Sequence, residues 1–350
     1  MNSVHKEKPS SQKRITVVGG GAVGLNVAAR LAISGQHVSL FTRRPEAAKA
    51  FESQGLRLVD PARNQECSAR LLVDRKLEDS VKAGTNRWLI CLRTGETDAI
   101  ARRIHTLMPN AQVASLQNDV INEEILGQYF SQVVGIVLRQ TCTLRDVNTV
   151  LATGKGRVIL GDYPAGWGAL SADWADDFEE AGFEVGRSHD ILSDKWLKLV
   201  YNCLSAVNAL IQKEDHVKPE FVEIKVRLLE EAQAALAAAN IAHSSCDGRD
   251  RTIHAEIENL RRAFIDGTSR RDLPLYNACW AALQDPARPL EADLYHERIL
   301  SLAKRHGLSA PSHRVIFAAV SKAWTERTGP EKLRAVAVLK AIDSNPFQAS

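Results

Sequence analysis

The sequence lacks the features that would place the chain in a membrane or on nucleic acid. No stretch of its 350 residues approaches the 18 or so consecutive apolar residues of a membrane-spanning helix. Residues 1–13 contain no apolar segment of a signal peptide, so we expect a disordered polar tail and a cytoplasmic protein. The chain has 45 lysine and arginine residues and 42 aspartate and glutamate residues, and the basic residues form no block. This pattern excludes a basic surface of the kind that binds nucleic acid.

Metal-binding spacings are also missing. The chain has 6 cysteines and 10 histidines, but no Cys-x-x-Cys pair and no His/Cys cluster at zinc spacing. His296 stands alone on a predicted helix, and His306 and His313 flank a Gly/Pro turn. We therefore predict reduced thiols, structural or solvated histidines, and no metal site.

A glycine-rich turn directly follows a β-branched run. Ile-Thr-Val-Val at 15–18 leads into a Gly-x-Gly-x-x-Gly pattern and then into a helix predicted over 23–34. A strand can turn directly into a helix over a pyrophosphate only if side chains are absent where the chain bends and where the phosphate approaches. A tight loop is the alternative, but a second strand predicted at 37–42 favours a βαβ unit. We expect the turn to bind a dinucleotide through Gly19, Gly20, Gly21, Ala22, Val23 and Gly24.

The residues at the end of the second predicted strand indicate which dinucleotide the turn binds. NAD-specific folds carry an acidic residue about 20 residues past the glycines, where it holds the ribose 2′-hydroxyl. This chain has Arg43 and Arg44 there, and we expect no nearby carboxylate. The two cations favour the 2′-phosphate of NADP(H), and a solvated basic loop is the alternative.

The length and the pattern of apolar residues predict an α/β protein of two domains. Composition is that of a globular chain, with 45% hydrophobic and 25% charged residues. Short apolar runs alternating with helical patterns predict a mostly parallel NADP-binding sheet domain over 14–188, and three- and four-residue apolar spacing predicts a helical substrate domain over 189–350. Strands are predicted at 15–19, 38–42, 88–92, 112–116, 133–138 and 158–161, a hairpin at 56–59 and 69–73, and helices at 221–240, 252–265 and 288–306.

Four segments, in this order along the chain, resemble one family. The first is the glycine-rich turn with Arg43 after the second strand. The others are Leu116-Gln-Asn-Asp119, then Asp194-Lys-Trp-Leu-Lys-Leu-Val-Tyr-Asn202, then Leu283-Gln-Asp285 with Arg288-Pro-Leu-Glu-Ala-Asp293 and Gly307-x-x-x-Pro311. From about residue 15 to about residue 319, the chain resembles the ketopantoate reductases (2-dehydropantoate 2-reductases).

The resemblance implies a fold and an activity. The fold would be an N-terminal Rossmann-type doubly wound sheet followed by an all-helical C-terminal domain. The activity would be NADP(H)-dependent reduction of a small 2-keto acid, 2-dehydropantoate in pantothenate biosynthesis, by a monomer or homodimer. A reductase of a different 2-oxo acid and a non-catalytic NADP(H)-binding sensor are the alternatives. Lys198 and Glu291 argue against a sensor, because nucleotide binding alone needs neither.

The resemblance also assigns the proton donor to Lys198. Reduction of a ketone by hydride needs an acid beside the carbonyl oxygen, where negative charge develops. Asn202 lies four residues further along the predicted helix, shares the face of Lys198, and is a candidate substrate-binding residue. A surface lysine is the alternative for Lys198, and we interpret Lys195 as its exposed neighbour.

Three more positions acquire roles from the resemblance. Glu291 matches a carboxylate that accepts a hydrogen bond from a substrate hydroxyl, although a helix N-terminal glutamate is the alternative. Asn118, at the carboxyl end of a strand, would hold the cofactor ribose or orient Lys198, and a turn residue is the alternative. Arg93 stands where the family has a lysine near the adenosine phosphate.

The chain departs from the family pattern at several substrate positions. The second asparagine of the lysine helix is replaced by Ala206, and a substrate-contacting serine is replaced by Ala281. Asp119 replaces a glycine, and Leu290 replaces a threonine. Because these changes fall on substrate contacts, the sequence leaves the 2-keto acid itself open.

Overall fold

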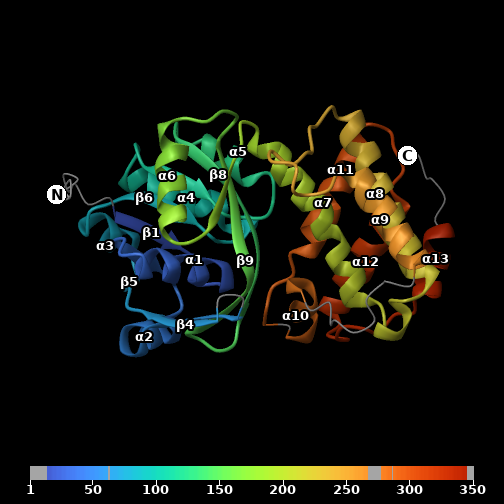
Figure 1. Ribbon diagram of the computed structural model, residues 1–350, viewed down its shortest axis with the longest axis horizontal. Helices are drawn as coiled ribbons and strands as arrows, with labels where there is room; N and C mark the ends of the chain where they lie inside the picture. The colour runs from blue at the N-terminus through green and yellow to red at the C-terminus, as the bar shows by residue number, and fades with distance from the viewer. Residues whose placement is uncertain (1–13, 62–63, 267–276, 286, 345–350) are drawn as a thin grey trace, which may run out of the picture. The chain divides into compact units, whose positions relative to one another are not determined.

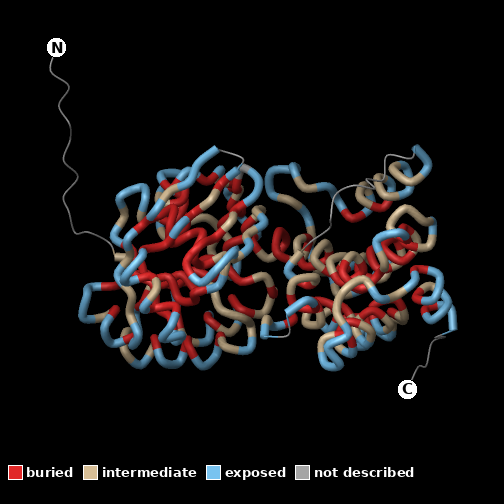
Figure 2. Tube along the Cα trace, turned by 90° about the horizontal axis from the view of Figure 1, so that it is seen from below, coloured by how far each residue is buried: buried red, intermediate tan, exposed pale blue. Residues whose placement is uncertain are grey.

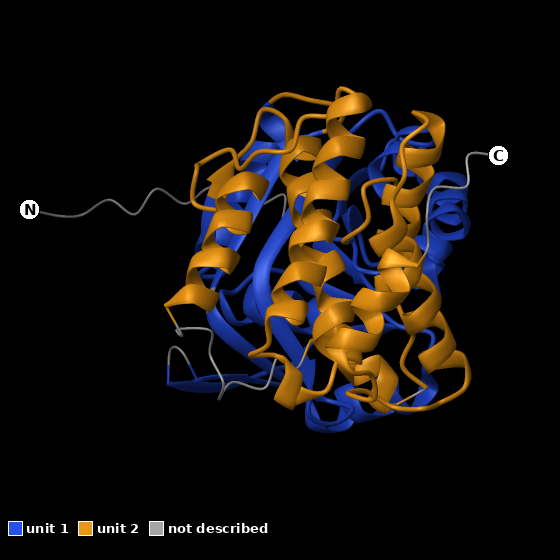
Figure 3. Cartoon of the chain, turned by 90° about the vertical axis from the view of Figure 1, so that its right-hand side faces the viewer, with its two compact units in different colours: residues 1–117, 122–162, 167–185 blue, residues 118–121, 163–166, 186–350 orange. Residues whose placement is uncertain are grey.

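The structure is a computed structural model that describes residues 14–61, 64–266, 277–285 and 287–344. Its contacts divide the chain into two units (Figure 3). Unit 1 contains the described residues of 14–117, 122–162 and 167–185, and unit 2 those of 118–121, 163–166 and 186–344. The predicted tail at 1–13 lies outside the described residues, and the predicted boundary at 188/189 is close to residue 186, where the longest segment of unit 2 begins.

Unit 1 is built on one sheet with the strand order β4-β3-β9-β8-β7-β6-β1-β2-β5, and β10 pairs with β9. Neighbours from β8 to β5 along this order are parallel, whereas β8 and β9 are antiparallel. The strands are β1 (Arg14–Val18), β2 (Val38–Phe41), β3 (Leu56–Asp60), β4 (Gln65–Ala69), β5 (Leu72–Asp74), β6 (Thr85–Ile90), β7 (Gln112–Ser115), β8 (Val133–Leu144), β9 (Thr149–Asp162) and β10 (Glu184–Arg187).

Helices flank this sheet, as the ribbon in Figure 1 shows. Buried residues run along the central strands (Figure 2), and β1 and β2 are buried on both faces, which explains their uninterrupted apolar runs. The helices are α1 (Ala22–Ile33), α2 (Pro45–Gln54), α3 (Leu77–Lys82), the 3₁₀ helix η2 (Thr94–Glu96), α4 (Thr97–Leu107), α5 (Asn122–Gly127) and α6 (Ala169–Glu180).

The predicted hairpin was wrong in its second arm. β3 pairs antiparallel with β4 at Gln65–Ala69, whereas the apolar residues near 72 form β5, which pairs in parallel with β2. β4 lies at one edge of the sheet, and its first residues are mostly exposed. It therefore has no apolar run by which the sequence could identify it. The strand predicted at 158–161 is likewise only the end of β9, which pairs with β8 along most of its length.

The described residues of unit 2 form helices and the loops that join them, apart from the end of β10 at residues 186–187 and one isolated bridge between Ile211 and Leu333. Helix α7 contributes to two apolar cores, one with α8, α10, α12 and α13 and one with α8, α9 and α11. The helices are α7 (Ile191–Leu210), the 3₁₀ helix η3 (Lys213–Asp215), α8 (Pro219–Ala238), α9 (Ile253–Ile265), α10 (Ala278–Gln284), α11 (Ala292–Arg305), α12 (Pro311–Thr325) and α13 (Ala335–Asp343). The predicted fold class, a Rossmann-type sheet followed by a helical domain, is confirmed.

Candidate active site

The glycine-rich turn lies between β1 and α1, and each glycine has a different environment. Gly19 has a φ of +123°, and a Cβ there would lie 2.7 Å from the carbonyl oxygen of Cys91. A Cβ on Gly24 would lie 2.1 Å from the carbonyl oxygen of Gly19, so α1 passes too close for any side chain. A Cβ on Gly21 would meet no atom within 4 Å. The turn is therefore tightly packed where the chain bends and open at Gly21, which suits a pyrophosphate.

The N-terminus of α1 has no side chain that satisfies its amides. Gly21 is the N-cap, no side-chain cap is present, and the first turn contains no acidic residue. The amides of Ala22, Val23 and Gly24 are at the positive end of the helix dipole. An anion bound beside Gly21 would satisfy them, which is the usual chemistry of a dinucleotide site.

Both arginines after β2 interact near this turn. Arg44 donates a hydrogen bond to the carbonyl oxygen of Gly20. Arg43 forms an ion pair with Glu96, so the expectation of no nearby carboxylate was wrong, because η2 brings an acid from a distant part of the sequence. The side chains of Arg43 and Glu96 are 66% and 35% exposed. Such an exposed pair contributes about 0 to 1 kcal/mol, so a phosphate can replace Glu96 as the partner of Arg43.

Arg93 lies at the start of the same loop. It is the half-buried N-cap of η2, three residues after the end of β6 and directly before Thr94. Its carbonyl oxygen accepts a hydrogen bond of 2.9 Å from the amide of Glu96, the residue that pairs with Arg43. Glu96 thus connects the loops that carry Arg43 and Arg93.

Lys198 and Asn202 occupy one face of α7. The helix begins at Ile191, after Asp190, whose carboxylate accepts a hydrogen bond of 3.2 Å from the amide of Ser193. Both Lys198 and Asn202 are half-buried, and their four-residue spacing puts them one turn apart. A lysine that keeps some access to solvent can recover a donated proton, as a general acid must.

The interpretation of Lys195 as an exposed residue was wrong. Its side chain is 1% exposed and is among the largest fully buried side chains of the chain. Its neighbour Asp194 is equally buried and accepts hydrogen bonds from the Ser188 hydroxyl at 2.7 Å and the Cys246 amide at 3.0 Å. The first turns of α7 are therefore surrounded by other segments, which the alternation of polar and apolar residues did not reveal.

Tyr295 connects two of the predicted site residues. Its hydroxyl donates a hydrogen bond of 3.1 Å to Glu291 Oε2 and also interacts with the side chain of Asn118. Tyr295 is 6% exposed, and burial, followed by the charge of Glu291, raises its pKa well above the usual value. The phenol therefore stays protonated near neutral pH and can donate to the carboxylate.

Asp119, the neighbour of Asn118, is fixed by the same helix. Arg298 donates through Nε at 3.1 and 3.2 Å and through Nη2 at 3.0 Å to the two carboxylate oxygens of Asp119, which is 1% exposed. Glu291 is the N-cap of α11. Tyr295 follows it by four residues and Arg298 follows Tyr295 by three, so the three side chains lie on one face of the helix. Sequence reasoning missed Tyr295 and Arg298, although their spacing from Glu291 was a usable signal.

Two histidines that sequence spacing separates are neighbours in unit 2. His296 Nδ1 lies 2.9 Å from His313 Nδ1, and Cys203 is close to both. His296 is the one histidine of α11, but it has a partner on α12 that ligand spacing in the sequence had not indicated. The cluster belongs to the interior and is considered further below.

Comparison with known proteins decides the family. The family model described as "Ketopantoate reductase PanE/ApbA" matches residues 15–165, and its C-terminal counterpart matches residues 190–323. The chain belongs to the ketopantoate reductase family. It is 25% identical to the 2-dehydropantoate 2-reductase of Pyrococcus abyssi over 309 residues, which cover 87% of this chain and 95% of that protein. It is 24% identical to the Caulobacter vibrioides protein of the same name over 319 residues, 88% and 98% of the two chains.

Solved structures show the same fold. A ketopantoate reductase of this family from Ralstonia eutropha JMP134 has a TM-score of 0.73 and 23% identity, covering 90% of this chain and 99% of that one. D-Mandelate dehydrogenase in a ternary structure with NADH and anilino(oxo)acetate also has a TM-score of 0.73, at 16% identity, with coverage of 90% and 99%.

Family membership identifies the chain as an NADP(H)-dependent oxidoreductase of the 2-dehydropantoate 2-reductase type. The cofactor fits unit 1, because Gly21 is open and the α1 amides have no side-chain cap. Within the described ranges, no helix is both long and apolar enough to cross a membrane.

The two alanines at family substrate positions lie in different environments. Ala206 is 0% exposed and belongs to an apolar core with Leu210 and Phe221. Ala281, on α10, is half-buried. An asparagine amide at position 206 would be buried among apolar side chains, whereas a serine at 281 would keep access to solvent. The surroundings of position 206 therefore disfavour a polar side chain, and those of position 281 do not.

Proposed function

We propose that this protein reduces 2-dehydropantoate (ketopantoate) to pantoate with NADPH, and that Lys198 is the proton donor. The observation that carries the proposal is that Lys198 and Asn202 lie on one face of α7. The same unit contains Tyr295, whose hydroxyl interacts with both Glu291 and Asn118. A purely nucleotide-binding protein needs none of these groups.

The bound cofactor supplies a hydride to the 2-keto carbon of the substrate. Lys198 Nζ donates its proton to the carbonyl oxygen as that oxygen becomes an alkoxide, and the amine then regains a proton from solvent. Asn202 orients the substrate by hydrogen bonds beside Lys198. Glu291 accepts a hydrogen bond from the substrate hydroxyl, while Tyr295 fixes the carboxylate that does so.

The cofactor would be held by unit 1. The open Gly21 and the amides of Ala22 to Gly24 suit the pyrophosphate, and Arg43 and Arg44 suit the 2′-phosphate of NADP(H). Arg93, beside η2, would contact the adenosine phosphate. A different 2-oxo acid is the second candidate substrate, because Ala206 and Ala281 leave fewer polar groups for a substrate hydroxyl.

NADPH oxidation with ketopantoate and with trimethylpyruvate, which has the same carbon skeleton without the hydroxyl, tests the activity and its substrate. We expect ketopantoate to have the higher kcat/KM, and Ala281→Ser to raise it by up to about tenfold, the value of one hydrogen bond. A preference for trimethylpyruvate would support the second candidate. NADPH binding without turnover of any 2-oxo acid would leave a sensor and refute the proposal.

The proton donor is tested by Lys198→Ala, with Lys195→Met as the control. We expect Lys198→Ala to lower kcat by about 10² to 10⁴ with NADPH affinity retained, the usual contribution of a positioned acid. Methionine keeps the buried aliphatic stem of Lys195, which alanine would not. If Lys195→Met alone lowered kcat in a folded protein, the assignment would pass to Lys195.

A further inference from the structure

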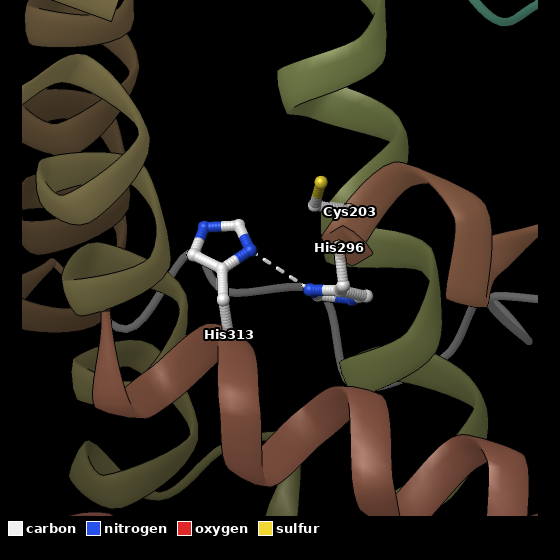
Figure 4. A group of neighbouring side chains, drawn as sticks. All are labelled: Cys203, His296 and His313. Atoms are coloured by element: carbon white, nitrogen blue, oxygen red, sulfur yellow. Dashed lines mark hydrogen bonds between the residues drawn. The ribbon is translucent and has the colours of Figure 1, made fainter. Parts of the chain in front are cut away.

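Three potential metal ligands meet inside unit 2, in a cluster that we call the Cys203 cluster: Cys203 of α7, His296 of α11 and His313 of α12 (Figure 4). Cys203 is 1% exposed and both histidines are 0% exposed. Their ligand atoms, one per residue, all lie within 4.8 Å of one another. The proposed reaction uses none of the three.

The hydrogen bonds of the two rings leave one polar atom without a good partner. His313 Nε2 lies 3.0 Å from the carbonyl oxygen of Leu228, which can only accept, so this nitrogen carries the hydrogen and Nδ1 has the lone pair. Both rings are 0% exposed, and burial favours the neutral form of an imidazole. His296 Nδ1 must then donate across the 2.9 Å contact. His296 Nε2 makes no hydrogen bond of good geometry among the described residues, and the other interaction of the ring is with the Cys203 backbone.

The other tautomer of His296 is no better satisfied. If Nε2 carries the hydrogen, two lone pairs face each other across 2.9 Å. A cation between the two Nδ1 atoms removes this conflict, and His313 already has the backbone hydrogen bond that metal-bound histidines use to fix their ring. Each neutral tautomer of His296 therefore leaves either one nitrogen without a good hydrogen bond or two lone pairs in contact, and a bound cation would relieve both.

We propose that the Cys203 cluster binds one soft monovalent cation, Cu(I). On binding, the Sγ–H proton leaves to solvent, a metal–sulfur bond forms, and both Nδ1 lone pairs are donated. Thiolate and imidazole ligands select Cu(I) or Zn²⁺, but Zn²⁺ sites are nearly always four-coordinate, and this cluster has three ligands among the described residues.

Charge favours the monovalent ion. One thiolate neutralises Cu(I) but leaves a Zn²⁺ site with a net positive charge in an apolar core, which is strongly unfavourable. Glu231, which approaches the backbone of His313, uses its oxygens on the amides of Ser312 at 2.9 Å and His313 at 3.1 Å. It is not part of the Cys203 cluster.

Binding requires a small rearrangement. Bonds of about 2.0 to 2.3 Å in a trigonal site hold ligand atoms roughly 3.5 to 3.7 Å apart. The two nitrogens, 2.9 Å apart, must therefore separate by about 0.6 Å or slightly more, and the sulfur must approach to within that spacing. Because Cys203 directly follows Asn202 on α7, a bound ion would also stiffen the helix that carries Lys198.

Anaerobic competition with a chromophoric Cu(I) chelator, on the reduced full-length protein, tests the site. We expect one equivalent to bind to the wild type and to Cys279→Ala, the matched control for a buried cysteine of the same unit. Cys203→Ala should weaken binding by about a hundredfold or more, since even residues outside the first ligand sphere change metal affinity 10- to 100-fold. Equal binding by wild type and Cys203→Ala would overturn the proposal, as would loss of binding on Cys246→Ser, which removes an exposed thiol.

X-ray absorption of the Cu(I)-loaded wild type keeps the proposal testable if Cys203→Ala does not fold. We expect one sulfur and two nitrogen ligands. A sulfur-only shell, or no retained copper, would refute the site. Tighter binding of Zn²⁺ than of Cu(I) at the same ligands would refute the choice of a monovalent ion.

Discussion

Replacing Tyr295 by phenylalanine removes one hydroxyl from the centre of the candidate site. The hydroxyl donates to Glu291 Oε2 at 3.1 Å and interacts with Asn118, and the side chain around it is 6% exposed. Phenylalanine keeps the ring and its packing against the core of α7, α8 and α11. The substitution therefore tests whether Glu291 must be held in one orientation to accept the substrate hydroxyl.

The expected magnitude follows from the type of bond. Hydrogen bonds to a charged group contribute about 1.5 to 3 kcal/mol, and the lower end applies because Glu291 is only half-buried. Since about 1.4 kcal/mol is tenfold, kcat/KM for ketopantoate should fall about tenfold, mainly through KM. Trimethylpyruvate has no hydroxyl for Glu291, so its kcat/KM should change by no more than about twofold.

Steady-state rates of NADPH oxidation with both substrates make the measurement. Tyr129→Phe is the matched control, because it removes a phenol–carboxylate hydrogen bond of 2.6 Å to Asp98 in unit 1. It should leave both substrates unaffected. Equal losses on both substrates with Tyr295→Phe would refute a role for Tyr295 in orienting Glu291 and would indicate a general structural effect.

Two other outcomes are expected. Arg43→Ala combined with Arg44→Ala should weaken NADPH binding by about 10- to 100-fold and leave NADH binding nearly unaffected, as measured by fluorescence titration. Equal losses for the two cofactors would show that neither arginine binds the 2′-phosphate. Hydrogen bonds from Arg334 and then Lys218 hold the pKa of Asp215 below its usual range. The ionised carboxylate therefore stabilises the folded state at pH values above its unfolded pKa of about 3.9, and this stabilisation is lost as the pH falls below that value. Asp215→Asn should therefore destabilise the protein more at pH 7 than at pH 3 in urea unfolding, and an equal effect at both would contradict this reasoning.

The parts of the site that are continuous in sequence could be predicted from it. The glycine turn between β1 and α1 can be identified from residues within ten positions, although the Cys91 carbonyl that crowds Gly19 comes from a distant part of the sequence. The central strands were predicted within a few residues of their ends because parallel strands buried on both faces carry unbroken apolar runs.

Contacts between distant segments could not be predicted. Arg298 and Asp119 are 179 residues apart, and neither has a sequence pattern that identifies its partner. Lys195 follows the buried Asp194 on α7, but a lysine in an amphipathic helix is ordinarily exposed, so its burial needed the neighbouring segments to be seen. The Cys203 cluster, drawn from three helices, escaped the search for metal-ligand spacing for the same reason.

Asp119 changes how the departures from the family pattern should be interpreted. In the sequence, Asp119 only replaces a glycine of the family pattern. In the structure, its carboxylate is buried and accepts hydrogen bonds from Arg298 through both oxygens. Removing Arg298 would take the ion pair from the buried Asp119 carboxylate, which is unfavourable, so the pair supports the segment of Asn118. Ala206 is likewise part of a packed apolar core. Ala281, on α10, is half-buried and could carry a polar side chain, so we expect any difference in substrate hydroxyl recognition from the family to originate there.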